Sequence, residues 1–314
     1  MDWLALSLLC ALCLACADAA TKAWLTGYSA RELALVRFTL TGLLLTPLLV
    51  GMPPLGDLPP AFWGWVAVMV PLEIAAMLLY MAAIRDHPLS LTLPYLAFTP
   101  AFVLLVAFVL LGEQPTPSGA SGVLLVVCGA WLLNVRHARR DDWRSWAEPL
   151  RAIFYEPGSR MMLAVAVIYA FTSTLSKGAM QHMAPGHFGP FYFALLGLAA
   201  LVLFGLPQPA RLLRAFGLKR ADRRAGNGPP SLNGHRPLPR VGAVLAVVGL
   251  NGLMVYTHFL ALQRVEVAYM ISVKRVSLLL GILFGALIFG EPGLKTHLPA
   301  GALMLAGVVL IALG

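Results

Sequence analysis

Long apolar stretches constrain this sequence more than any other feature. A helix that spans the hydrocarbon core of a bilayer needs about 20 predominantly apolar residues, and the chain contains ten stretches near that length. They leave no segment long enough for a separate soluble domain, so we predict an all-α membrane protein with ten transmembrane helices. The predicted spans are roughly 3–25, 30–51, 61–84, 89–111, 118–135, 161–181, 187–206, 241–262, 267–289 and 297–313.

Positive charge is concentrated in two loops. The formal net charge is +9, and 14 of the 23 Lys and Arg residues lie within 136–160 and 207–240. Clusters of this kind are typical of loops that remain in the cytoplasm, so we do not interpret the charge as a sign of nucleic-acid binding. With ten spans, both loops fall on the side opposite the termini. The charge distribution therefore predicts that both termini lie outside the cytoplasm.

Sequence motifs exclude several other classes of protein. Cys10, Cys13, Cys16 and Cys128 show no Cys/His spacing of the kind that binds zinc, and we expect neither a metal site nor a cofactor. The chain has no GxxxxGK[ST] loop for ATP and no HExxH or GxSxG motif for hydrolysis. A secondary transporter is therefore favoured over an ATP-driven pump or a membrane enzyme.

The sequence repeats itself at two constant offsets. Residues 18–43 match 173–198 at an offset of 155, and after a longer loop in the second half the offset becomes 178. The Gly-Glu dipeptides at 112–113 and 290–291, each closing the fourth span of its half, correspond at the second offset. Because five spans reverse the direction of the chain, the two halves would form an inverted repeat, as in many secondary transporters.

This repeat divides the chain into three parts. We predict two five-helix repeats, 1–135 and 161–314, joined by the basic linker 136–160. Apolar side chains at helical spacing in the linker indicate a short helix lying on the membrane surface. The segment 207–240 is predicted to be a flexible loop within the second repeat.

The two Gly-Glu dipeptides and the glycine-containing spans that follow them, GASGVLLVVCGAWLL and LPAGALMLAGVVLIALG, carry a family resemblance. The chain resembles the drug/metabolite transporter superfamily, in its EamA-type ten-helix form, over nearly its whole length. The resemblance implies a transporter of the membrane, here a bacterial inner membrane. It also implies that both termini lie in the cytoplasm. We give the charge distribution more weight on that point because it is strongly one-sided in this sequence.

Lys274 and Arg275 are adjacent within the ninth predicted span. They lie about 12 Å along a helix from Val267, which is a long way for snorkelling to the membrane face. No Asp or Glu occurs between Val267 and Gly290 to neutralise them. An anion would do so, since Arg offers a planar fork and Lys a point charge, a combination suited to phosphate or carboxylate. A structural role within the bundle is the alternative.

Other ionisable residues also fall inside the predicted spans. Asp18 and Lys22 are four residues apart on one helix and can pair with each other. Arg37 can reach the membrane face or meet Glu73. Glu73 either carries a proton during transport or locks the bundle, and Asp18 and His258 are further candidates for proton coupling.

The VKRV motif around the Lys-Arg pair resembles the organic phosphate/phosphate translocators of plastids. Those carriers have a KRV motif in the ninth span and a lysine late in the sixth, which together grip the phosphate. The matching residues here are Lys274, Arg275 and Lys177. A tyrosine of their eighth span corresponds most closely to Tyr256, and Lys22 is the repeat counterpart of Lys177. The resemblance implies that these residues bind an anionic substrate.

We therefore predict a secondary transporter that moves a small anionic metabolite, an organic phosphate or carboxylate, by alternating access. An exporter of amino acids, drugs or other amphipathic metabolites and a lipid-linked sugar flippase remain open as alternatives with the same fold. The expected partners are the substrate and membrane lipid. The GxxxG spacing of Gly281 and Gly285 permits close helix packing, inside the bundle or in a homodimer.

Overall fold

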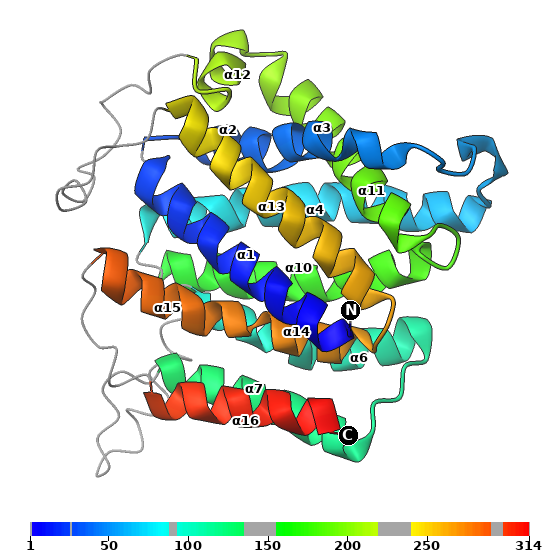
Figure 1. Ribbon diagram of the computed structural model, residues 1–314, viewed down its shortest axis with the longest axis vertical. Helices are drawn as coiled ribbons and strands as arrows, with labels where there is room; N and C mark the ends of the chain where they lie inside the picture. Colours follow the sequence, from blue (N-terminus) through cyan, green and yellow to red (C-terminus); the bar gives the residue numbers. More distant parts are fainter. Residues whose placement is uncertain are drawn as a thin grey trace.

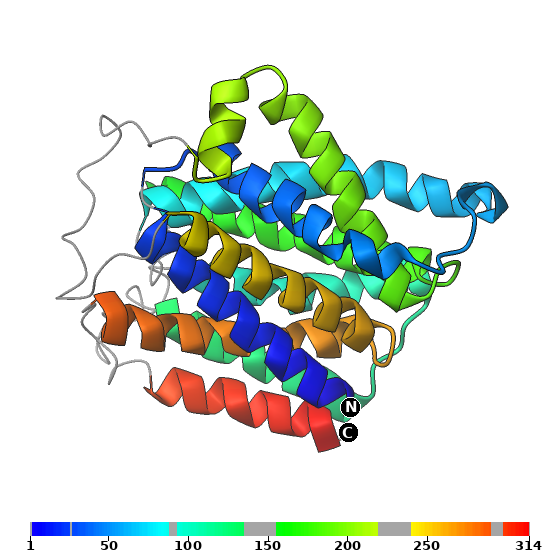
Figure 2. The same ribbon diagram turned by 45° about the horizontal axis from the view of Figure 1, so that its top comes forward.

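The chain forms a bundle of helices that lie side by side (Figure 1). No strand occurs in the part of the chain that the structure describes. Both termini lie at the same end of the bundle, as an even number of crossings requires (Figures 1 and 2). The ranges described by this computed structural model are 2–25, 27–87, 93–134, 155–218, 240–289 and 298–313.

The helices follow the predicted apolar stretches closely, and several of them are built from two or more consecutive helical segments. Their bounds are α1 Trp3–Trp24; α2 Ala30–Ala34, the π-helix η1 Leu35–Leu40, α3 Thr41–Leu45 and η2 Thr46–Leu49; η3 Leu55–Asp57; α4 Pro60–Asp86; η4 Leu93–Phe98 and α6 Thr99–Leu111; α7 Pro117–Asn134; α10 Pro157–Ala179; α11 Pro185–Ala200 and the π-helix η5 Leu201–Gly205; α12 Pro209–Ala215; α13 Arg240–Leu262; α14 Val267–Lys274 and α15 Val276–Phe289; and α16 Leu298–Leu313.

In the part of the chain that the structure describes, seven helical segments are long and apolar enough to cross a membrane. Three shorter apolar helices, Tyr95–Leu111, Pro117–Leu132 and Pro299–Leu313, occupy the other predicted spans. The prediction of an all-helical chain is therefore confirmed for the described ranges, and the observed helix ends lie within a few residues of the predicted ones.

Proline and glycine mark many of the helix ends. Pro60, Pro157 and Pro185 stand in the first turns of α4, α10 and α11. Proline suits these positions because the missing N–H would have no partner within the helix and its fixed φ is already helical. At the other end, α6 is closed by Gly112 with φ of 68°, a left-handed conformation that glycine adopts without strain.

The linker predictions need correction at their edges. The segment 207–240, predicted to be a flexible loop, contains helix α12, and Arg214 of this helix lies 3.1 Å from Glu32 of α2 in an ion pair. Helix α10 begins at Pro157, so the end of the predicted linker 136–160 belongs to that helix. Nearly all of the predicted surface helix, and residues 219–239 of the loop, lie outside the described residues.

Two helix crossings bring backbones unusually close together. Where α7 crosses α16, a Cβ atom on Gly122 would lie 2.7 Å from the carbonyl oxygen of Gly307. Where η1 and α3 cross α11, a Cβ atom on Gly197 would lie 2.8 Å from the carbonyl oxygen of Phe38. Beside the second crossing, the rings of Phe38 and Phe193 pack edge to face, with centroids 5.9 Å apart. Small residues thus permit the close packing that is typical of helices in membranes.

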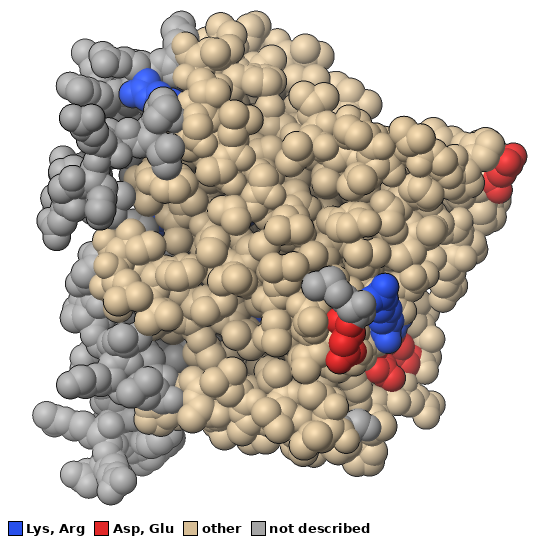
Figure 3. Space-filling view, in the orientation of Figure 1, with Lys and Arg blue, Asp and Glu red and all other residues tan. Residues whose placement is uncertain are grey.

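Large apolar side chains are exposed on the outer surface of the bundle. In Figure 3 the described Lys, Arg, Asp and Glu side chains gather toward the two ends of the visible face, and other residues form the surface between them. Leu105, Val109, Leu245 and Leu287 are each more than half exposed on the helices. Such a surface suits contact with lipid, so polar chemistry has to be sought inside the bundle.

Candidate functional site

A cavity of about 100 Å³ lies among the helices. A water molecule needs roughly 10–15 Å³ of such space, so the cavity has room for several waters or for the polar part of a small solute. Its walls come mainly from α4, α10, α11, α13 and α14, and single residues of α1, η1 and η4 and Arg275 complete them. The ionisable side chains that line it are Arg37, Glu73, Tyr80, Tyr169, Tyr192, His258, Lys274 and Arg275.

The ninth apolar stretch is interrupted at the Lys-Arg pair. Helix α14 ends at Lys274, Arg275 is outside both helices, and α15 begins at Val276. The N–H of Arg275 donates to the carbonyl oxygens of Ile271 and Ser272, at 3.2 and 3.0 Å, rather than to one regular partner. Neighbouring side chains on a continuous helix point about 100° apart. The break helps both members of the pair to line the cavity, and interrupted helices are common at transporter substrate sites.

Within the described residues, neither cation of the pair has an acidic side chain as an ion-pair partner. Arg275 is 3% exposed, and its buried Nε has no hydrogen-bond partner in the described ranges. The Nζ of Lys274 lies 3.4 Å from the Nδ1 of His258. Among the described residues, neither cation makes an ion pair with a carboxylate. The pair therefore presents positive charge to the cavity.

Arg37, by contrast, is held by several partners. One of its Nη atoms donates to Asp18 at 2.7 Å and to Thr21 at 3.0 Å, and the other donates to Asn251 at 3.1 Å. The hydroxyl of Tyr80 donates to the second carboxylate oxygen of Asp18 at 2.5 Å. Arg37 lies in a π-helical turn, a feature frequent at functional sites. Its charge is offset by Asp18 within a polar network at the edge of the cavity.

These contacts correct two predictions. Asp18 was expected to pair with Lys22 along α1, and the structure holds it through Arg37 and Tyr80 of other helices. Arg37 was expected to reach the membrane face or to meet Glu73. It is 2% exposed and its ion-pair partner is Asp18. The sequence could not reveal this pairing because the helices involved meet only in the folded bundle.

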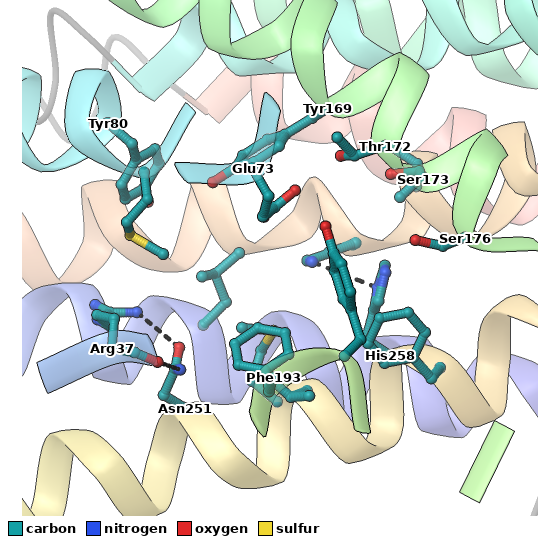
Figure 4. Close-up of a pocket in the computed structure, with 18 of the residues that line it drawn as sticks. Arg37, Glu73, Tyr80, Tyr169, Thr172, Ser173, Ser176, Phe193, Asn251 and His258 are labelled. Atoms are coloured by element: carbon teal, nitrogen blue, oxygen red, sulfur yellow. Dashed lines mark hydrogen bonds between the residues drawn. The ribbon is translucent and has the colours of Figure 1, made fainter. Parts of the chain in front are cut away.

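Glu73 projects into the cavity from α4, two residues after Pro71, which lies inside that helix. In Figure 4, Glu73 lies on one side of the open space and Asn251 and His258 lie on the other. Glu73 is close enough to Lys274 to interact with it electrostatically. It nevertheless makes no ion pair within the part of the chain that the structure describes.

The structure does not bring Lys177 to the Lys-Arg pair. Lys177 lies at the end of α10, where its Nζ is 2.5 Å from Glu113 and donates to the carbonyl oxygen of Val265 at 2.7 Å. It does not line the cavity. The expectation that Lys177 joins Lys274 and Arg275 around one anion therefore has no support in this arrangement.

Of the remaining candidate residues, one lines the cavity and the others do not. His258 lines the cavity beside Lys274. Tyr256, half-buried on α13, and Lys22, half-buried in the last turn of α1, do not line it. Gly281 and Gly285 are both buried within the chain, which places their GxxxG spacing inside the bundle.

Sequence reasoning missed several residues that line the cavity. Tyr169 and Tyr192 contribute aromatic rings and hydroxyl groups, and Thr172, Ser173 and Ser176 add hydroxyl groups from α10. A signal for the latter group existed, since FTSTLS is an unusually hydroxyl-rich run within an apolar span. In the described ranges, no group of three or more His, Cys, Asp or Glu side chains is placed to hold a metal ion.

Comparison with known proteins identifies the class of molecule. The EamA-like transporter family matches residues 1–135 and 157–313. The chain belongs to the EamA-like transporter family. It is therefore a multi-pass membrane transporter rather than an enzyme.

Two relatives of this EamA-like transporter are informative. Over 72 residues it is 34% identical to the probable 4-amino-4-deoxy-L-arabinose-phosphoundecaprenol flippase subunit ArnE of Enterobacter sp. (strain 638), a match that covers 23% of this chain and 67% of the relative. Its fold is similar to that of a protein in a solved crystal structure, with a TM-score of 0.63 and 17% identity, over 99% of this chain and 95% of that chain. At that identity the likeness concerns the fold alone.

Proposed function

We propose that this EamA-like transporter moves a small anionic metabolite, an organic phosphate or carboxylate, by alternating access. One observation carries the proposal: Lys274 and Arg275 line the interior cavity, and neither makes an ion pair among the described residues. Cations in a low-dielectric interior are unfavourable unless paired and hydrogen-bonded. A phosphate or carboxylate between them would supply charge-assisted hydrogen bonds, and the Arg fork can bind it through two parallel ones.

The balance of charge around the cavity supports an anionic substrate. Three cationic side chains line it, those of Arg37, Lys274 and Arg275, and Asp18 offsets the first of them. Glu73 is the one carboxylate in the described lining. The net charge of these five side chains is +1 when Glu73 is ionised and +2 when Glu73 is protonated. Binding of an anion would lower the electrostatic cost in both cases.

For the transport cycle, we assign the chain to two inverted five-helix repeats, 1–135 and 161–314. Residues that correspond at the offset of 178 line the same cavity, Glu73 with Asn251 and Tyr80 with His258. This arrangement supports a substrate site near an axis that relates the two repeats. Alternating access would then come from movement of one repeat against the other.

The crossing between η1 or α3 and α11 supports the same assignment. Phe38 and Phe193 correspond at the offset of 155 and pack against each other. Gly42 and Gly197 also correspond, and a Cβ atom on either one would collide with the carbonyl oxygen of the phenylalanine in the other repeat. Reciprocal contact of this kind is expected where a two-fold axis relates two similar units.

A lipid-linked sugar flippase of the same fold is the second candidate. The name of the ArnE relative describes a phosphate-bearing lipid-linked sugar as its substrate, and a flipped phosphate also needs a basic centre. The cavity of about 100 Å³ would hold only the polar head of such a molecule. The polyprenyl chain would have to leave the bundle between two helices.

Transport by the purified chain in liposomes tests both candidates. Liposomes loaded with one organic phosphate should exchange it for labelled phosphate ester outside, and Lys274→Gln should abolish the exchange. Asp57→Asn, which removes a charge at an exposed position of η3, is the control. Absence of exchange together with protein-dependent movement of a fluorescent polyprenyl phosphate sugar would favour the flippase. We expect the native location to be a bacterial inner membrane.

A further inference from the structure

Glu73 shares the cavity with Lys274 and Arg275 but pairs with neither. Opposite charges attract strongly in an interior of low dielectric, and lysine has a long, flexible side chain that can reach a nearby acid. The Nζ of Lys274 lies 3.4 Å from the Nδ1 of His258, and no ion pair of 4.0 Å or less joins it to Glu73. One small cavity is therefore lined by a carboxylate and two cations that form no ion pair with one another.

We infer that the substrate is a zwitterion, whose anionic group lies on Lys274 and Arg275 and whose ammonium group lies on Glu73. The inference rests on the proposed function, because it takes the anion site at the Lys-Arg pair as given and adds a second point of recognition. A small solute that bears both charges could contact the two cations and Glu73 within one cavity. A solute with anionic groups alone would bring negative charge toward the Glu73 carboxylate.

The surroundings of Glu73 suit an ammonium group for a second reason. Tyr169 of α10 and Tyr192 of α11 both lie within electrostatic range of Glu73, and Phe193 lines the same cavity. Aromatic faces attract cations, most strongly where water is excluded. The hydroxyl of Tyr192 donates to the carbonyl oxygen of Met69 at 3.3 Å, which fixes the position of its ring. A carboxylate among aromatic rings is a suitable site for an ammonium group.

Hydroxyl groups complete the polar wall between these charges. Thr172 and Ser173 lie on the same side of the open space as Glu73 in Figure 4, and Ser176 follows one turn later on α10. Hydroxyl groups both donate and accept hydrogen bonds, so they can contact a solute of either charge. They would hold the uncharged middle of a zwitterion without favouring one end.

Matched phosphate esters test the inference directly. We would titrate the purified full-length chain with phosphoethanolamine and with propyl phosphate, which has a methyl group in place of the ammonium group. Aminopropyl phosphate and butyl phosphate form a second pair with a longer spacing. In at least one pair the amine should strengthen binding by about tenfold or more, the order expected for one charged hydrogen bond. Glu73→Gln should remove this preference without weakening the binding of the amine-free esters, and Asp57→Asn should preserve it.

The possible failures can be told apart. Equal affinity within both pairs, for wild type and Glu73→Gln alike, would overturn the inference. If Lys274→Gln still weakened the binding of all four esters in that case, the proposed anion site would stand. If Lys274→Gln bound the esters as tightly as the wild type, the proposed anion site and the inference would both be wrong. If none of the esters bound to the wild type, organic phosphates would be excluded as substrates, and the same titration with an amino acid and the matched amine-free carboxylate would decide the inference.

Discussion

The Nζ of Lys177 lies 2.5 Å from the carboxylate of Glu113. The other carboxylate oxygen of Glu113 accepts a hydrogen bond from the N–H of Val267 at 3.0 Å, and Lys177 donates to the carbonyl oxygen of Val265 at 2.7 Å. This ion pair connects the end of α10 to the turn after α6 and to the start of α14. It gives Lys177 a role in holding helices together, away from the cavity that Lys274 and Arg275 line.

Replacement of Lys177 by Gln should therefore affect stability more than binding. The change removes one partner of a half-buried ion pair, so we expect a loss of about 1–3 kcal/mol in the free energy of unfolding. Affinity for a phosphate ester should stay close to that of the wild type. Denaturant unfolding in detergent and a binding titration measure the two quantities. Weakened binding with normal stability would instead place Lys177 in the anion site.

The buried pair of Asp18 and Arg37 should be more sensitive. Removal of one partner of such a pair leaves an uncompensated charge, so Asp18→Asn should lower the free energy of unfolding by about 3–5 kcal/mol. Tyr80→Phe removes one hydrogen bond to the same carboxylate, and we expect a smaller loss, about 1 kcal/mol. Denaturant unfolding compares the two variants. Near-normal stability of Asp18→Asn would show that the network does not hold the bundle together.

The helices could be predicted from the sequence, but their polar contacts could not. Apolar length and the prolines at helix starts place α4 and α10 to within a few residues. Pairing of Asp18 with Arg37 depends on how separate helices meet, and nothing local in the sequence encodes it. The interruption at Arg275 was also missed, because VKRV contains no proline or glycine to indicate a break.

The candidate site was predictable from the sequence only where a basic residue in an apolar span has no acidic residue nearby in the sequence. Lys274 and Arg275 stood out because no acid occurs nearby in the sequence, and both line the cavity. Lys177 satisfied the same criterion, yet its partner Glu113 comes from a distant part of the chain. Tyr169 gave no signal, since an aromatic residue in an apolar span is most often part of the core.

Glu73→Gln should uncouple transport from a pH gradient if Glu73 carries the proton. The titratable groups within electrostatic range of Glu73 are Lys274 of α14, Tyr169 of α10 and Tyr192 of α11. Glu73 is the one carboxylate in the described lining of the cavity, which makes it the candidate for carrying the proton. Uptake into liposomes with and without an imposed pH gradient measures the effect. Asp57→Asn at an exposed position is the control, and an unchanged gradient dependence in Glu73→Gln would remove Glu73 from the coupling mechanism.

Both termini should lie outside the cytoplasm. Fourteen of the 23 Lys and Arg residues occur in the segments 136–160 and 207–240, and an odd number of predicted spans separates each segment from either terminus, which places both opposite the termini. Because the two termini lie at the same end of the bundle (Figure 1), one C-terminal fusion reports on both. Alkaline phosphatase fused there should be active and a fluorescent protein dark. A bright fluorescent fusion with inactive phosphatase would contradict the prediction.

The most direct test of the central claim is a binding titration of the Lys274 and Arg275 variants. Arg275→Lys keeps the charge but removes the planar fork, so affinity for phosphoethanolamine or propyl phosphate should fall while the protein remains folded. Lys274→Gln should weaken binding by about 1.5–3 kcal/mol, the range for a charged hydrogen-bond partner. Thermal unfolding of each variant, with Asp57→Asn as the control, separates binding from folding. The account predicts weakened binding by folded variants. Normal affinity in both, accompanied by poor stability, would show that the pair is structural and would contradict it.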